Sequence, residues 1–382
     1  MKKHLILFLF DNSISSSLSF ILDSIMTFYL LKQGFKISEI SLYFAISLLI
    51  TTLIEFPSGI IADKYGRKTI YSLGLFCRAL QCLMLIFSTN IIILFFAGIF
   101  EGIHNSFVSG SLDAWLLKTD NNINFEKLLS LNKIFTSILS IVLIIFLSVS
   151  FNNSKIYIVI FLFIYLIVSI LNMIYLQDNK DKDASFRSNI LLALDFLKNQ
   201  TSKLLLLILL LFYGIISVYM LLFQSIVELN GYSDSFMLFL SLFSLLSGLV
   251  SGIMFQTFSK NNKKNVCINI SLIGIIISFT IFVLFTNKTA LLIGNTLYGY
   301  SSATLFPFFY SELYKMLPVQ AIATNISAIS SVASLFASFL TYILGLIPEL
   351  LSLSMIGYIG IFFSICSFFI IKLKFKSTLI YK

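Results

Sequence analysis

Charged residues are scarce in this sequence. Asp, Glu, Lys and Arg together make up only 11% of its 382 residues, whereas 58% are hydrophobic. Soluble domains carry about 25% charged residues, so this composition excludes an ordinary soluble protein. Apolar runs of about 20 residues recur along the chain, and each is long enough to cross roughly 30 Å of hydrocarbon. The sequence therefore predicts an all-α integral membrane protein.

Groups that bind metals or cofactors are also rare. The chain has four cysteines and two histidines. All four cysteines fall within predicted spans, none has a partner at metal-ligand spacing, and we expect them to pack as small apolar side chains. There is no P-loop for a nucleotide and no His/Cys cluster. We therefore expect no metal, no cofactor, no enzymatic activity and no ATP-driven transport.

Twelve apolar segments are predicted to span the membrane. They cover approximately residues 5–31, 38–61, 69–87, 91–114, 128–150, 156–176, 204–228, 234–258, 266–286, 289–312, 321–346 and 351–371. Lys and Arg gather at both ends of the chain and in alternate loops, which the positive-inside rule assigns to the cytoplasm. Both termini are therefore predicted to be cytoplasmic, and the net charge of +9 requires no nucleic-acid partner.

The longest polar segment, residues 177–203, divides the spans into two groups of six. Apolar residues recur at helical spacing between Phe186 and Leu197, which predicts a short amphipathic helix on the membrane surface, with a plain linker as the alternative. The predicted domains are a six-helix bundle at 1–178, a cytoplasmic linker at 179–203 and a second six-helix bundle at 204–382.

A short repeat relates the two halves. Ser58-Gly59-Ile60 recurs as Ser251-Gly252-Ile253, and each copy lies near the cytoplasmic end of the second span of its half. A basic loop follows both copies. This placement predicts two parallel structural repeats related by an axis along the membrane normal.

The first copy lies in EFPSGIIADKYGRK, residues 55–68, where an apolar span ends in charge. This segment resembles the signature loop between spans two and three of the major facilitator superfamily. The resemblance implies twelve transmembrane helices in two six-helix bundles, and a loop that stabilises the outward-facing state. The residues of this conformational-lock motif are Gly59, Asp63, Lys64, Gly66, Arg67 and Lys68, with Asp113 as the acidic partner on span four and Asp120 as the alternative. A purely topogenic role for the charges is the other interpretation.

Two glycines have separate expected roles in this motif. Gly59 is expected to let two helices approach closely. Gly66 is expected to form a tight turn with positive φ.

The Glu-x-Pro-Ser-Gly portion is similar to bacterial drug or macrolide efflux-like members of that family. This resemblance implies proton-driven export of a small amphipathic compound by a monomer in a bacterial cytoplasmic membrane. Its partners would be the substrate, protons and the lipid bilayer. Two features depart from the pattern: the family arginine expected near Gly98 is absent, with Glu101 as the nearby charge, and span five has neither Gly nor Pro. A nutrient importer or facilitator is therefore the alternative, and a non-transporting membrane protein the third.

Ionisable residues inside spans are costly and indicate function. The first half holds five candidates for proton coupling: Asp11, Asp23, Arg78, Glu101 and His104. Arg78 and Glu101 both lie near mid-span, so they are predicted to pair, and pairing of Arg78 with Asp11 or Asp23 is the alternative. Glu101 and His104 are one helical turn apart and share a face. A polar residue satisfied within a helix interface is the other interpretation of His104.

The second half has few charges within its spans. Family analogy places the substrate cavity among spans one, four, seven and ten, which makes Tyr219, Gln224, Asn295 and Tyr298 the candidates on this side. Ordinary packing is the alternative for each. A cavity with one charged wall and one aromatic and amide wall suits an amphipathic molecule and disfavours a multiply anionic one.

Overall fold

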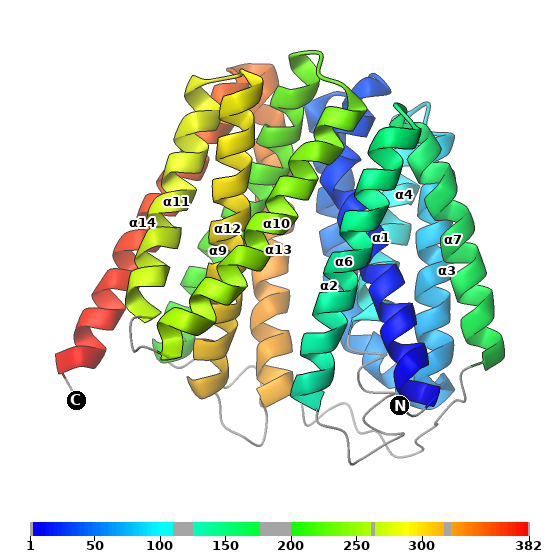
Figure 1. The fold of residues 1–382 in the computed structure, drawn as a ribbon, viewed down its shortest axis with the longest axis horizontal. Coiled ribbons are helices and arrows are strands. Elements are labelled where there is room, and N and C mark those ends of the chain that lie inside the picture. Colours follow the sequence, from blue (N-terminus) through cyan, green and yellow to red (C-terminus); the bar gives the residue numbers. More distant parts are fainter. Residues whose placement is uncertain (1–2, 110–124, 176–199, 261–263, 317–321, 381–382) are drawn as a thin grey trace. The chain divides into compact units, whose positions relative to one another are not determined.

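The structure, a computed structural model, describes residues 3–109, 125–175, 200–260, 264–316 and 322–380. These segments form helices joined by short turns, with twelve helices in the described part of the chain (Figure 1). They are α1 (Lys3–Lys32), α2 (Ile37–Tyr65), α3 (Arg67–Ile86), α4 (Ile91–Val108), α6 (Phe125–Ser150), α7 (Ser154–Tyr175), α9 (Gln200–Leu229), α10 (Asp234–Lys260), α11 (Lys264–Leu284), α12 (Lys288–Met316), α13 (Ile322–Leu350) and α14 (Leu353–Ile380).

Each predicted span corresponds to one of these helices, so the all-helical prediction is confirmed. The largest differences at helix ends concern α14, which continues to Ile380 where residue 371 was expected, and α4, which was expected to continue to residue 114. It ends at Val108, because Ser109 leaves the helical conformation while its backbone N–H still bonds to the Asn105 carbonyl. The predicted amphipathic helix at 186–197 lies outside the described residues, as does most of the linker.

The chain forms two compact units. One comprises residues 1–35 with 42–186, and the other comprises residues 36–41 with 187–382. Within the first unit, α3 packs against both α4 and α7, and α1 packs against α6. Within the second, α12 packs against α10 and α11, and α9 packs against α13 and α14 (Figure 1).

Eleven helices in the described part of the chain are long and apolar enough to cross a membrane. The twelfth, α12, is not among them, because Asn, Tyr, Ser and Thr side chains interrupt its apolar sequence. These side chains have partners inside the second unit: Thr304 contacts Ser251 of α10 at 2.7 Å, and Asn295 donates to the Leu240 carbonyl at 2.6 Å. Packing between α10 and α11 explains why α12 tolerates a more polar sequence.

Large apolar side chains are exposed along the helices, as a bilayer-embedded surface requires. Val149 of α6 is 82% exposed and Phe339 of α13 is 66% exposed. Small polar groups, mostly serine and threonine hydroxyls, are instead buried between helices and bond to backbone carbonyls, for example from Ser169 to Ser72 at 2.8 Å. This inverted distribution agrees with a membrane protein.

The turn between α2 and α3 is a single residue, Gly66. Its φ of 105° confirms the positive φ expected for this glycine. Its N–H donates to the Ala62 carbonyl at 2.9 Å, and its own carbonyl accepts the N–H of Ile70 at 3.1 Å, so one residue ends one helix and starts the next. A side chain here would force a backbone conformation that residues other than glycine rarely adopt.

We expect Gly66→Ala to lower the free energy of unfolding by about 1–3 kcal/mol, the usual cost of such a backbone conformation. Gly252→Ala is the matched control from the second repeat, because an added Cβ there would meet no described atom within 4 Å and the φ is not positive. Thermal unfolding of both purified variants in detergent measures the difference. Equal midpoints for the two variants would contradict the assigned role of Gly66.

Candidate functional site

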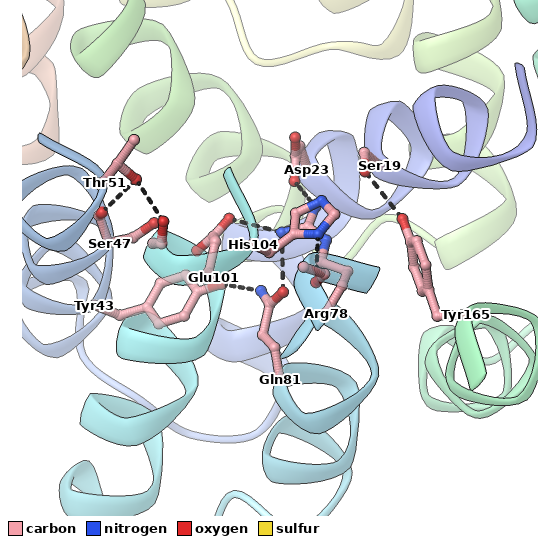
Figure 2. Close-up of polar contacts among 12 residues, drawn as sticks. Ser19, Asp23, Tyr43, Ser47, Thr51, Arg78, Gln81, Glu101, His104 and Tyr165 are labelled. Atoms are coloured by element: carbon pink, nitrogen blue, oxygen red, sulfur yellow. Dashed lines mark hydrogen bonds and ion pairs between the residues drawn. The ribbon is translucent and has the colours of Figure 1, made fainter. Parts of the chain in front are cut away.

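Three helices of the first unit bring opposite charges together at Arg78. This residue lies midway along α3, and only 1% of its surface is exposed. Its Nη2 donates to Oδ1 of Asp23 on α1 at 2.6 Å, and its Nη1 donates to Oε1 of Glu101 on α4 at 3.1 Å (Figure 2). The guanidinium is therefore neutralised from two sides, and the Arg78 cluster is defined as Arg78, Asp23 and Glu101.

The sequence left the partner of Arg78 open between Glu101 and an aspartate of the first span. The structure pairs Arg78 with both Glu101 and Asp23. Asp11 is not a partner of Arg78, because it lies twelve residues, or about 18 Å along α1, before Asp23. Its side chain is buried next to Asn172 of α7 instead.

Two neutral residues add hydrogen bonds around the cluster. Gln81 lies one turn after Arg78 on α3, accepts from its Nη1 at 2.9 Å and donates to the Tyr43 hydroxyl of α2 at 2.6 Å. The Tyr43 hydroxyl also faces the Glu101 carboxyl. Because the Tyr43 oxygen accepts from Gln81, its proton is available for Glu101. These residues fix the position of the Glu101 carboxyl relative to Arg78.

Sequence reasoning missed Tyr43 and Gln81. It searched the first half for ionisable groups, and both residues are uncharged. The available signal was the spacing of Gln81 from Arg78, since residues three apart share a helix face.

The exposure of the two carboxylates differs sharply. The Glu101 side chain is 8% exposed, whereas that of Asp23 is 45% exposed. With both carboxylates ionised, the three charges sum to −1. The cluster therefore combines a buried acid with an accessible one on the two sides of a single buried cation, in a span where unpaired charge is strongly disfavoured.

His104 has a structural contact in this arrangement. Its Nδ1 lies 2.9 Å from the carbonyl oxygen of Gly74 on α3. A carbonyl only accepts, so Nδ1 carries the proton and ties α4 to α3. The ring packs edge-on against Tyr165 at 6.1 Å between centroids. This geometry favours the interface interpretation of His104, and no ion pair of His104 occurs among the described residues.

Local sequence explains how α4 places Glu101. Asn90 starts the helix by accepting the N–H of Ile93 at 3.0 Å. Gly98 and Gly102 then form a small-xxx-small pair that packs on α2. A Cβ at Gly98 would lie 2.8 Å from the Tyr43 carbonyl oxygen, and one at Gly102 would lie 2.6 Å from that of Ser47. Their missing side chains let α4 approach α2 closely enough for Glu101 to face Tyr43.

The candidates of the second half gather within their own unit. Tyr219 of α9 stacks on Tyr298 of α12 with ring centroids 3.6 Å apart, and its hydroxyl donates to Asn295 Oδ1 at 2.5 Å. Asn295 and Gln224 are each only 1% exposed, and Tyr298 is nearly as buried. The structure therefore brings Tyr219, Asn295 and Tyr298 into one packed aromatic and amide group. Their role in a substrate cavity stays a prediction.

The conformational-lock motif is described in part. Gly59, Asp63 and Lys64 lie in the last turns of α2, but their side chains are outside the description, as are Asp113 and Asp120. Arg67 and Lys68 begin α3, where the helix dipole disfavours positive charge. Their position is therefore better explained by membrane topology or by pairing than by helix stability.

Within the described segments, there is no group of three or more His, Cys, Asp or Glu side chains arranged to hold a metal ion.

Comparison with known proteins identifies the family and the fold. The family model of the Major Facilitator Superfamily matches residues 5–342. A mutant of the nucleoside transporter NupG has a TM-score of 0.79 at 16% identity, with 96% of this chain and 99% of that chain covered. A POT family transporter in complex with 5-aminolevulinic acid has a TM-score of 0.73 at 12% identity, with 95% and 94% covered.

A third structure, a bacterial homolog of the human lysosomal transporter Spinster in an inward-facing, unoccupied conformation, has a TM-score of 0.66 at 13% identity. The alignment with it covers 92% of this chain and 84% of that chain. Identities this low establish a shared fold and nothing finer. No curated protein sequence matches the chain.

We expect Arg78→Gln to destabilise the protein by about 3–5 kcal/mol, because it leaves the buried Glu101 without its cation. Adding Glu101→Gln to the same chain should restore much of the loss, since both buried charges are then gone while Asp23 stays accessible. Thermal unfolding in detergent of the wild type, the two single variants and the double variant completes the cycle. Additive effects of the two substitutions would show that Arg78 and Glu101 do not stabilise each other.

Proposed function

Because the chain belongs to the major facilitator superfamily, we propose that it is a proton-coupled secondary transporter that moves a small organic molecule by alternating access. The observation that supports coupling is the Arg78 cluster. Ion pairs inside a membrane span are retained at a cost in stability, and they mark ion or proton pathways by default. Family membership makes the protein a transporter rather than an enzyme.

The proposed coupling follows from charge balance. Two carboxylates share one guanidinium, so one bound proton makes the cluster neutral. Glu101 is the proposed proton carrier, because it is buried and faces the Tyr43 hydroxyl. Asp23 is the proposed gate to the aqueous or substrate side, because its side chain is half exposed. Protonation of Glu101 would loosen its bond to Arg78, which then pairs with Asp23 alone.

The direction of transport has two candidates. Sequence similarity to efflux-like members suggests export by proton antiport. The structures of similar fold include a nucleoside transporter and a transporter bound to 5-aminolevulinic acid, both concerned with small polar organic molecules, so import is equally compatible. The proposed substrate class is therefore a small neutral or amphipathic molecule.

We expect Glu101→Gln and Asp23→Asn each to reduce proton-driven transport at least about tenfold, because a fixed neutral amide cannot exchange a proton. The protein is reconstituted into proteoliposomes with an imposed pH gradient of either sign, and tritiated uridine and ethidium serve as probes. Uptake along the proton gradient indicates symport, and movement against it indicates antiport.

Glu228→Gln is the control, because Glu228 lies near the end of α9, outside the Arg78 cluster. If the wild type moves a probe at the same rate with and without the gradient, the coupling proposal is wrong. Full gradient-driven activity in both Glu101→Gln and Asp23→Asn would also refute it.

A further inference from the structure

The first helix carries a row of polar residues with a spacing of four. Asp11, Ser15, Ser19 and Asp23 follow one another along α1, and residues four apart lie on the same helix face. Each step rises about 6 Å, so the row spans about 18 Å from Asp11 to Asp23. Asp23 is its last member and belongs to the Arg78 cluster. The row therefore ends at the proposed coupling site.

The seam between α1 and α7 holds the partners of this row. The Tyr165 hydroxyl of α7 lies 2.9 Å from Ser19 Oγ and 3.5 Å from the Ser15 carbonyl oxygen. It also lies next to the Arg78 guanidinium. Tyr165 is only 1% exposed. One hydroxyl thus bonds to the side chain of Ser19, lies near the backbone of Ser15 and adjoins the cluster.

Asp11 occupies the other end of the row in an unusual environment. It is 4% exposed and lies within a candidate membrane span, Leu9–Lys32. The Asn172 amide of α7 is beside it and is 7% exposed. Among the described residues, neither Asp11 oxygen nor Asn172 Nδ2 makes a hydrogen bond of normal geometry. A buried carboxyl and a buried amide thus face each other without satisfying each other.

A different face of the same helix shows what structural packing requires. Ser13 donates to Asn132 at 3.1 Å and Ser17 donates to the Thr136 carbonyl at 2.9 Å, both on α6. These contacts are neutral, and each one joins α1 to α6 by a hydrogen bond. A carboxyl at position 11 adds desolvation cost without adding such a bond, which argues for a role beyond packing.

The ionisable side chain described near Asp11 on the packed helices is exposed, and the side chains of Lys3, His4, Glu126 and Lys127 lie outside the description. On α6 the nearby ionisable residue is Lys133, whose side chain is exposed. On α7 the residue that faces Asp11 is the neutral Asn172. In this part of the described chain, Asp11 therefore has no buried counter-ion, unlike the two acids bound to Arg78.

We propose that the α1–α7 seam conducts protons between the membrane face at which α1 begins and the Arg78 cluster, with Asp11 as the outer proton-binding site. The proposal rests on the proposed proton coupling. The Asp11 carboxylic acid releases a proton toward Ser15. Each hydroxyl of Ser15, Tyr165 and Ser19 accepts one proton and releases its own, and the Asp23 carboxylate accepts the last one. Steps longer than a direct hydrogen bond are bridged by water, which relays protons between side chains.

The test compares proton-driven transport with exchange in the same proteoliposomes. Asp11→Asn removes the outer proton site, and Tyr165→Phe removes one hydroxyl while keeping the ring. We expect each to lower gradient-driven accumulation about tenfold more than it lowers exchange, because exchange requires no net proton movement. The probe is tritiated uridine or ethidium, whichever the wild type moves. Ser13→Ala, on the face toward α6, is the matched control and should lower both rates equally or not at all.

A second readout requires no substrate. Infrared spectra of the reconstituted protein, recorded over a pH titration, detect the carbonyl stretch of a protonated carboxylic acid. We expect Asp11→Asn to remove one titrating component of that band, and Tyr165→Phe to preserve it. An unchanged titration in Asp11→Asn would overturn the assignment of Asp11 as a proton-binding site.

The outcomes separate the two proposals. If the rate of wild-type transport is the same with and without the pH gradient, the proposed function is wrong. If wild-type transport is coupled but Asp11→Asn and Tyr165→Phe keep full coupling, the proposal of proton conduction along the α1–α7 seam is wrong, while the proposed function stands. Equal loss of accumulation and exchange in both variants would assign these residues to folding or substrate binding and would also overturn the seam. Size-exclusion profiles and unfolding midpoints verify that each variant is folded.

Discussion

A guanidinium that is 1% exposed inside a membrane span cannot remain without anions, because neither lipid nor water is available to solvate it. Arg78 therefore determines which helices of the first unit must meet. It draws Asp23 from α1 and Glu101 from α4 to one point on α3. The neutral residues Gln81 and Tyr43 extend the hydrogen bonding around this point. The arrangement leaves one acid buried and the other accessible on the two sides of a single buried cation.

Backbone contact makes this charge pairing possible. The glycines at positions 98 and 102 remove side chains between α4 and α2, so Tyr43 and Glu101 come within reach of each other. On the other side of the unit, α1 uses serines toward α6 for packing and a row ending in Asp23 toward α7. One helix thus presents a face that packs through hydroxyl groups and a second face that carries carboxyl and hydroxyl groups.

The second unit buries its polar groups between helices mainly without charge. Apart from Asp234 at the start of α10, the buried polar groups described in this unit are hydroxyls, amides and tyrosines. They bond to backbone or to one another, as Asn295 does with the Leu240 carbonyl and Tyr219. Such neutral contacts are far cheaper in a membrane than ion pairs. This explains why α12 can be too polar to be a candidate span and still pack between α10 and α11.

Sequence alone determined the helical class and the approximate bounds of every described helix, because hydrocarbon thickness imposes a fixed length of apolar residues. It also identified Arg78, Asp23 and Glu101 as candidates, since charge stands out against an apolar background. It could not choose between the two acids, and the structure shows that both bind. Tyr43, Gln81 and Tyr165 escaped notice because neutral side chains are common in spans. Only the tertiary structure decides which of these side chains meet. Their contacts depend on how each helix is rotated and on the distance between backbones, and the spacing of residues along one helix determines neither.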